Sequence, residues 1–227
     1  MTRLRHHLRR SPHLTLLALT ACIAACAGRA RVHQSLTTTA EQQNALAVSD
    51  ALETLIAVGK DSPADREYAY KVVLTCTTDT APDTFARAAV TGRLVQQKGL
   101  LGAYLVDDVE RFARRSRELD PRFRNGAATR LLGTLYVTAP ASLLKHGDSE
   151  EGLTLLEDLV EEYPDTLENH LSLAEAYIAL SDPAPAFPHL CRCIARKSTL
   201  RPDDQALLNM MIAGAGPLHC HDPEAVQ

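Results

Sequence analysis

The segments LGTLY (residues 132–136) and LAEAY (residues 173–177) share one pattern, forty-one residues apart. Each has a leucine, then a small residue, and then a tyrosine three positions further along. If both segments are helical, these positions lie on one helix face, and the small residue lets a partner helix approach closely. The sequence therefore predicts two successive helical hairpins. The residues predicted to pack within them are Leu132, Gly133, Tyr136, Leu173, Ala174, Tyr177 and, in the next helix, Ala186.

The rest of the chain is also predicted to be helical. It is rich in Ala, Leu, Glu, Arg and Gln, Pro and Gly interrupt it at regular places, and no stretch has the sustained alternation of a surface strand. Asp83, Asp148 and Asp203 stand where N-caps or first-turn acids are expected. The sequence predicts an all-α fold, a single domain over residues 40–213 followed by a C-terminal tail over 214–227. The predicted helices are 41–58, 64–77, 83–98, 102–118, 124–138, 148–163, 167–181, 184–198 and 203–213.

The spacing within the two hairpins is similar to that of the tetratricopeptide repeat, in which two antiparallel helices fill about 34 residues. Ala174 and Ala186 are twelve residues apart, and Ala186 and Cys193 are seven apart. The resemblance is clearest over residues 124–200, with an insertion around residues 139–146. It implies an array of stacked helical hairpins, a class of fold that usually binds other polypeptides.

A longer string, DPRFRNGAATRLLGTLYVTAP (residues 120–140), resembles the T-component family of TRAP transporters, which are periplasmic lipoproteins built from helical repeats. The chain departs from the family at His146, because the family usually has paired glycines before the aspartate that follows. The resemblance implies that the protein partners the substrate-binding subunit of a TRAP-type organic-acid importer. The matching residues are Asp120, Pro121, Gly126, Ala127, Arg130, Leu132, Gly133, Tyr136, Pro140, Gly147 and Asp148.

The first 25 residues have the features of an export signal. Four arginines and no acid precede residues 14–25, which are almost entirely apolar. Such a segment makes about 18 Å of helix, too short for the ~30 Å hydrocarbon core of a bilayer. Two tetrapeptides, LTAC and IAAC, resemble the lipobox of bacterial lipoproteins. We expect lipid attachment at Cys26, with Cys22 as the alternative, and ordinary cleavage near Ala30 without a lipid is the competing interpretation.

The segment after the predicted lipid site is expected to be a tether. Residues 26–39 end in a polar, aperiodic stretch, which is typical of a flexible linker between a lipid and a domain. The residue after Cys26 is Ala27, whereas an aspartate there commonly retains lipoproteins in the inner membrane. We therefore expect a periplasm-facing, lipid-anchored protein; Ala27 favours the outer membrane, and the inner membrane stays open.

Charge and composition argue against several classes of function. Removal of residues 1–25 takes four of the 24 Lys and Arg and none of the 28 Asp and Glu, which leaves a net charge of −8. Nucleic-acid binding is disfavoured, because it requires a basic face. The chain contains no GxSxG elbow, HExxH motif or phosphate-binding loop. We therefore expect a protein that is not an enzyme and has no cofactor.

In stacked hairpins, the first helices line a concave groove. The repeat register places Arg130 and Thr134 of one hairpin and Glu168 and Glu175 of the next in this groove. These four residues are the candidates for contact with a bound partner. Alternatively, Arg130 and Glu175 pair with each other across adjacent helices and only support the fold.

Export would place Cys76, Cys191, Cys193 and Cys220 in an oxidising compartment. Cys191 and Cys193 lie about 200° apart around a helix, so they cannot readily pair with each other. We expect one of them to form a disulfide with Cys220. A metal site built from these cysteines and nearby histidines lacks the CxxC or HxxxH spacing of established sites, so no metal is predicted.

Together these features predict a lipid-anchored helical-repeat protein that binds another protein. The family resemblance implies a periplasmic solute-binding protein as that partner. Two alternatives remain open: a small organic-acid ligand bound in a channel through the array, and a generic scaffold of the cell envelope. Oligomerisation of the protein is compatible with each of them.

Overall fold

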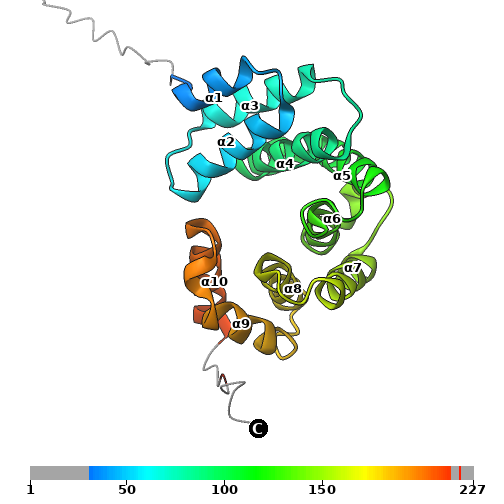
Figure 1. Cartoon of the computed structure of the whole chain (residues 1–227). Coiled ribbons are helices and arrows are strands. Elements are labelled where there is room, and N and C mark those ends of the chain that lie inside the picture. Colours follow the sequence, from blue (N-terminus) through cyan, green and yellow to red (C-terminus); the bar gives the residue numbers. More distant parts are fainter. Residues whose placement is uncertain (1–30, 216–219, 221–227) are drawn as a thin grey trace, which may run out of the picture.

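The structure, a computed structural model, describes residues 31–215 and Cys220. The chain forms a single all-α domain, as the sequence predicts, and the described residues contain no strand (Figure 1). The α-helices are α1 (Gln34–Ala40), α2 (Ala45–Ala57), α3 (Pro63–Thr75), α4 (Ala81–Lys98), α5 (Val106–Leu119), α6 (Ala127–Thr138), α7 (Ser149–Glu162), α8 (Leu167–Ala179), α9 (Ala186–Ala195) and α10 (Pro202–Ala215). Three 3₁₀ segments connect them: η1 (Gly99–Leu105), η2 (Ala141–Leu143) and η3 (Lys197–Thr199).

The starts of several helices are fixed by acidic residues. The carboxylate of Asp148 caps α7, accepting hydrogen bonds of 3.0 Å from the backbone N–H groups of both Glu150 and Glu151. Asp83 and Asp203 lie in the first turns of α4 and α10, where a negative charge stabilises the positive end of the helix dipole. These are the roles that the sequence pattern predicts for the three aspartates.

The N-terminal end of the domain differs from the prediction. Helix α1 covers residues that the sequence assigns to a tether, and its Leu36 is fully buried in a cluster with Val48 and Leu52 of α2. The tether predicted over residues 26–39 is therefore too long, because its second half is part of the folded domain. Leu36, with Val32 and Ala40 packed against the same cluster, docks this short helix, so the polar composition of the segment is misleading.

The helix predicted over residues 102–118 also begins later than expected. The 3₁₀ segment η1 precedes α5 and folds back against the end of α4. A Cβ atom at Gly102 would lie 3.1 Å from both Lys98 Cβ and Val95 Cα, so the close packing of η1 depends on this glycine.

Two glycines hold α6 and α7 close together. A Cβ atom at Gly133 would lie 2.6 Å from Leu156 Cγ and 2.9 Å from the backbone oxygen of Gly152. A Cβ atom at Gly152 would in turn lie 2.8 Å from the backbone oxygen of Gly133. Leu132 and Tyr136 are buried on either side of this contact. Any larger side chain at the two glycines would push the helices apart.

The next hairpin, α8 and α9, uses alanines in the equivalent places. Ala174 and Ala186 are both fully buried, and Leu173 is buried against α7. Tyr177, which corresponds to Tyr136, is only partly buried. The two hairpins therefore share their spacing but differ in how closely their helices and tyrosines pack.

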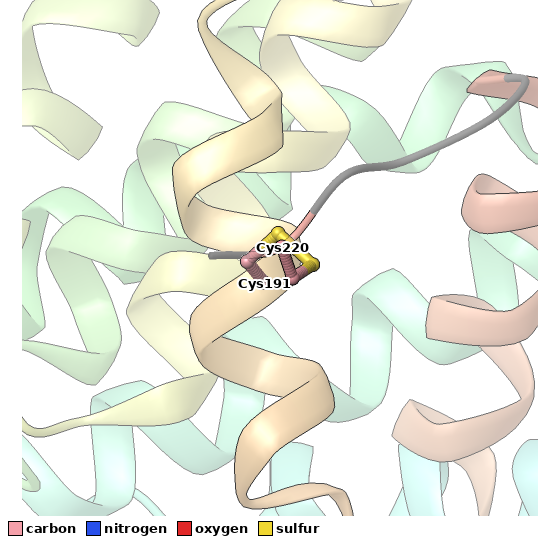
Figure 2. The surroundings of a disulfide bond; sticks show 2 residues. All are labelled: Cys191 and Cys220. Atoms are coloured by element: carbon pink, nitrogen blue, oxygen red, sulfur yellow. A yellow bond between two sulfur atoms is a disulfide. The ribbon is translucent and has the colours of Figure 1, made fainter. Parts of the chain in front are cut away.

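A disulfide bond between Cys191 and Cys220 joins α9 to the segment that follows α10 (Figure 2). It is one of the two pairings that the sequence leaves open. Cys193 instead lies inside the domain, where its thiol donates to the backbone oxygen of Leu167 at 3.6 Å. Burial raises the pKa of the Cys193 thiol to about 12, so this cysteine stays protonated and unreactive.

The first helices of successive pairs, α2, α4, α6 and α8, follow one another around a ring, and the last described helix, α10, continues it. Each second helix packs between its own partner and the helix that follows it. Helix α10 also contacts α2, so the two ends of the array meet (Figure 1). Within the described residues, no helix is both long enough and apolar enough to cross a membrane.

Candidate functional site

The charged and amide side chains on the facing sides of α6, α8 and α10 form the best candidate for a functional site. We call this set the inner polar face. Its members interact electrostatically across the three helices, since the charges of α8 and α10 alter the pKa of the arginine on α6. It consists of Arg130 on α6, Glu168, Asn169 and Glu175 on α8, and Asp204 on α10.

Arg130 is held in place by an amide. Its Nη1 donates to Asn169 Oδ1 at 2.6 Å, and the buried Asn169 side chain donates to the backbone oxygen of Asn125 at 3.3 Å. Burial lowers the pKa of Arg130, and the charges of Glu168 and Asp204 act in the opposite direction. The guanidinium thus remains a fixed positive group next to carboxylates with which it forms no direct ion pair in the described residues.

The alternative in which Arg130 pairs with Glu175 is not borne out, because Arg130 instead donates to Asn169 and forms no ion pair with Glu175 in the described residues. Helices α6 and α8 run side by side from adjacent starts, where Asn125 Nδ2 donates to Thr166 Oγ1 at 3.1 Å. Arg130, in the first turn of α6, is therefore level with Asn169 near the start of α8. Glu175 lies more than one turn further along its helix.

The other groove candidates are half-buried, as Arg130 is. Thr134 lies one turn after Arg130 on α6, while Glu168 and Glu175 lie on α8. Burial raises the pKa of Glu175, and the nearby charge of Asp204 raises it further. Three acids thus accompany one arginine on the inner polar face, so the face has an excess of negative charge.

Asp204 on α10 is the acid that sequence reasoning missed. Burial, followed by the negative charge of Asp203, raises the pKa of Asp204 to about 6, although Arg201 partly opposes this. The sequence shows Asp203 and Asp204 only as acids at the start of a helix. The approach of Asp204 to α8 depends on the contact between α10 and α8, for which the local sequence contains no signal.

An ion-pair network beside the inner polar face closes the ring. Arg93 on α4 binds both carboxylate oxygens of Glu53 on α2, each at 2.7 Å. Arg201, just before α10, donates to Glu53 at 3.0 Å and to Asp203 at 2.9 Å. Burial raises the pKa of Glu53, but the two arginines outweigh burial and leave its pKa lowered. Arg201 and Glu53 are 148 residues apart, so no short sequence pattern predicts their contact.

The insertion around residues 139–146 is anchored by a buried carboxylate that sequence reasoning also missed. Glu110 of α5 is fully buried and accepts a hydrogen bond of 3.0 Å from the hydroxyl of Tyr136. The backbone N–H groups of Lys145 and His146 donate to the same carboxylate at 3.0 and 2.9 Å. The insertion is therefore held against the domain rather than standing free of it.

A pair of histidines links α8 and α9. His170 Nε2 lies 2.8 Å from the backbone oxygen of Pro164, which accepts, so this nitrogen carries a proton. His170 Nδ1 lies 2.9 Å from His189 Nδ1, and when both rings are neutral His189 must donate. Burial lowers the pKa of both rings, that of His189 to about 4, and the pair is neutral at pH 7.

Two surface pockets accompany these groups. The first, of about 230 Å³, is lined by Glu168 of the inner polar face together with Asn125, Asp165, Thr166, Arg196 and Leu200, among others. The second, of about 340 Å³, lies on α5 next to the insertion and is lined by Asp107, Arg111, Arg114, Arg115, Glu118, Lys145 and His146. Both have linings of mixed charge. Neither lining brings a serine or cysteine nucleophile next to a general base.

The remaining predicted sites have a different status. Cys26 and Cys22, the candidates for lipid attachment, lie outside the described residues. Among the described residues, no group of three or more His, Cys, Asp or Glu side chains is arranged to hold a metal ion. Comparison with known proteins adds no assignment, because neither a protein-family model nor a curated protein matches this sequence.

Proposed function

We propose that this protein is a lipid-anchored, periplasm-facing helical-repeat protein that binds another protein through the inner polar face. The resemblance at residues 120–148 supports the substrate-binding subunit of a TRAP-type transporter as the partner. The observation that carries the proposal is the composition of the inner polar face. Glu168, Glu175 and Asp204 are partly withdrawn from water, and Arg130, the arginine beside them, is bonded to Asn169.

Acids in this setting favour binding. A half-buried carboxylate with a raised pKa costs folding free energy, and a lysine or arginine from a partner would offset that cost. Glu168 also lines a pocket of about 230 Å³, which is large enough for one side chain of a partner. The mixed charges around that pocket suit a polypeptide, because hydrogen-bond donors and acceptors alternate along its backbone.

The test is affinity capture with the full-length, membrane-anchored protein from solubilised envelopes. We expect one stoichiometric protein partner, identified by mass spectrometry as a solute receptor. The double variant Glu168→Gln, Glu175→Gln should weaken capture by about tenfold or more, because hydrogen bonds to charged groups contribute about 1.5–3 kcal/mol each. Glu151→Gln, an exposed acid on α7, is the matched control and should leave capture unchanged.

Two results would overturn the proposal. One is the absence of any stoichiometric protein in the wild-type capture. The other is a partner that the double variant retains in full. Mass analysis of the N-terminus checks the anchor independently, and we expect a diacylglycerol on Cys26 with the first 25 residues removed.

One observation favours a small organic acid as an alternative ligand. Within the described residues, the Arg130 side chain makes a single hydrogen bond, to Asn169, so further N–H donors of its guanidinium are available to a carboxylate. A carboxylic acid that co-purifies in place of a protein, and is lost in Arg130→Gln, would support this alternative.

A further inference from the structure

The connection between α4 and α5 presents large apolar side chains to solvent. In η1, Leu100 is 92% exposed, Leu101 82% and Tyr104 71%. We call these three residues the apolar turn. Connections on a protein surface usually carry polar side chains, and adjacent exposed apolar groups of this size are a common mark of an interaction site.

The apolar turn has a defined shape. The segment that carries it, η1, begins at Gly99, whose φ of +55° is in the left-handed region, and ends at Leu105, which is buried. Gly102 packs against the backbone of α4 at Val95. In a 3₁₀ helix, residues three apart lie above one another, so Leu101 and Tyr104 share one face. Local packing therefore holds the leucines and the tyrosine outward.

The apolar turn lies at the same end of the domain as the point where the chain enters the fold. The backbone N–H of His33 donates to the carboxylate of Asp65 at 2.6 Å, near the start of α3. Lys98, the residue before η1, pairs with Glu67 in the same part of α3 at 2.9 Å. The start of α3 thus contacts both the entry point of the chain and the end of α4.

Only a short stretch of chain separates this end of the domain from the proposed lipid site. Val32 packs against the N-terminal core, and it follows Cys26 by six residues. Six residues span at most about 22 Å when fully extended, whatever conformation they adopt. An acyl chain on Cys26 would therefore hold the entry point, and with it the apolar turn, near the bilayer surface.

We propose that the apolar turn contacts the membrane, with Leu100 and Leu101 entering the boundary between head groups and acyl chains. Tyr104 has an apolar ring and a polar hydroxyl, a combination that favours the membrane–water interface. The contact adds to the lipid anchor and orients the domain. This inference rests on the proposed lipid anchor, so its test must report on the anchor separately.

Tryptophan fluorescence provides the test, because the natural chain contains no Trp. The variants are Leu101→Trp in the apolar turn and, as control, Met210→Trp on α10, where the side chain is 66% exposed. Each full-length protein, purified from membranes as the cell has processed it, is mixed with phosphatidylcholine vesicles that carry brominated acyl chains. We expect residue 101 to show a blue-shifted emission and at least twofold quenching by the bromines, and residue 210 to show neither.

Each outcome separates the two proposals. A protein that binds vesicles while residue 101 stays unquenched overturns the membrane contact and leaves the anchor intact. A protein that fails to bind vesicles overturns the anchor itself. Equal quenching at residues 101 and 210 also contradicts a specific contact. A blue shift at residue 101 that depends on protein concentration, without vesicles, would show that a second copy covers the apolar turn. Leu100→Trp, at a position that is 92% exposed, repeats the test if the first variant does not fold.

Discussion

The hairpins α6/α7 and α8/α9 have the same Leu-small-x-x-Tyr pattern, yet they are stabilised in different ways. In both, the tyrosine hydroxyl donates to a glutamate on the second helix of the preceding pair, Tyr136 to Glu110 and Tyr177 to Glu157. Glu110 is fully buried and accepts two further backbone hydrogen bonds, whereas Glu157 is half-buried. The shared pattern sets the pairing of the helices, and the surroundings of each tyrosine set how much the contact contributes to stability.

Removing the two glutamates should give the largest difference between the hairpins. We expect Glu110→Ala to lower the free energy of unfolding by about 3–5 kcal/mol, because it leaves a buried hydroxyl and two backbone N–H groups without an acceptor. Glu157→Ala should cost about 0.5–1 kcal/mol, since water can replace the acceptor there. Urea denaturation of both variants measures this difference. Glu110→Gln keeps one acceptor and should fall between them, and equal losses at positions 110 and 157 would contradict the comparison.

The disulfide is a constraint on α9 of the α8/α9 hairpin, and in the described residues α6/α7 has no counterpart. Reduction of Cys191–Cys220, which closes a loop of 29 residues, should lower the free energy of unfolding by about 2–4 kcal/mol. Thermal unfolding with and without a reductant checks this, and Cys220→Ser is the matched variant that reductant should no longer affect. An unchanged melting temperature after verified reduction would contradict the prediction.

A substitution at the glycine contact of α6/α7 should lower the free energy of unfolding more than a substitution at the alanine contact of α8/α9. Gly152→Ala places a Cβ atom 2.7 Å from Tyr136 Cβ, and the overpacking should outweigh the better helix propensity of alanine. The net loss expected is about 1–3 kcal/mol. Ala186→Gly should cost about 1 kcal/mol, because it removes a fully buried methyl group. A stabilised Gly152→Ala variant, measured by chemical denaturation, would show that the helices move apart easily.

Acid should weaken α8/α9 through its histidines. The pKa of His189 is lowered from 6.5 to about 4 by burial, so its contribution to stability is complete above about pH 6.5 and is lost as the pH falls toward 4. We expect a loss of about 1–2 kcal/mol between pH 7 and pH 4.5 from this group. His189→Gln should flatten that dependence in denaturation curves. If the variant keeps the same pH dependence of stability, that dependence arises from other titratable groups.

Asp204 should give the free energy of unfolding the opposite pH dependence. Its pKa is raised from 3.8 to about 6, so the ionised carboxylate opposes folding above pH 6, and stability is regained as the pH falls toward 3.8. Asp204→Asn should therefore raise the free energy of unfolding by about 1 kcal/mol at pH 7 and by less at pH 5. The same pair of denaturation curves tests it, and Asp158→Asn, an exposed acid on α7, should change neither value. Destabilisation at pH 7 would mean that the carboxylate has a favourable partner.

The sequence predicts what depends on local pattern, and it does not predict what depends on distant contacts. The all-α character and the roles of Asp83, Asp148 and Asp203 follow from capping and periodicity, and they agree with the structure, whereas α1 and the 3₁₀ segment before α5 are not predicted. Asn169, the partner of Arg130, could have been found by counting positions from the starts of the two adjacent helices, because Arg130 and Asn169 both lie near those starts. Matching opposite charges points to Glu175 instead. Glu110 gave no signal, because an acid on a strongly charged helix is usually solvated, and here a distant loop buries it.

The contact between Arg201 and Glu53 changes how the array should come apart. An open stack of helical pairs can lose a terminal pair while the remaining pairs stay intact, because each pair touches only its neighbours. In this chain α2 of the first pair and the last described helix, α10, support one another, so fraying at one end also removes support from the other. We therefore expect the described domain to melt as a single cooperative unit and to resist stepwise trimming from either end.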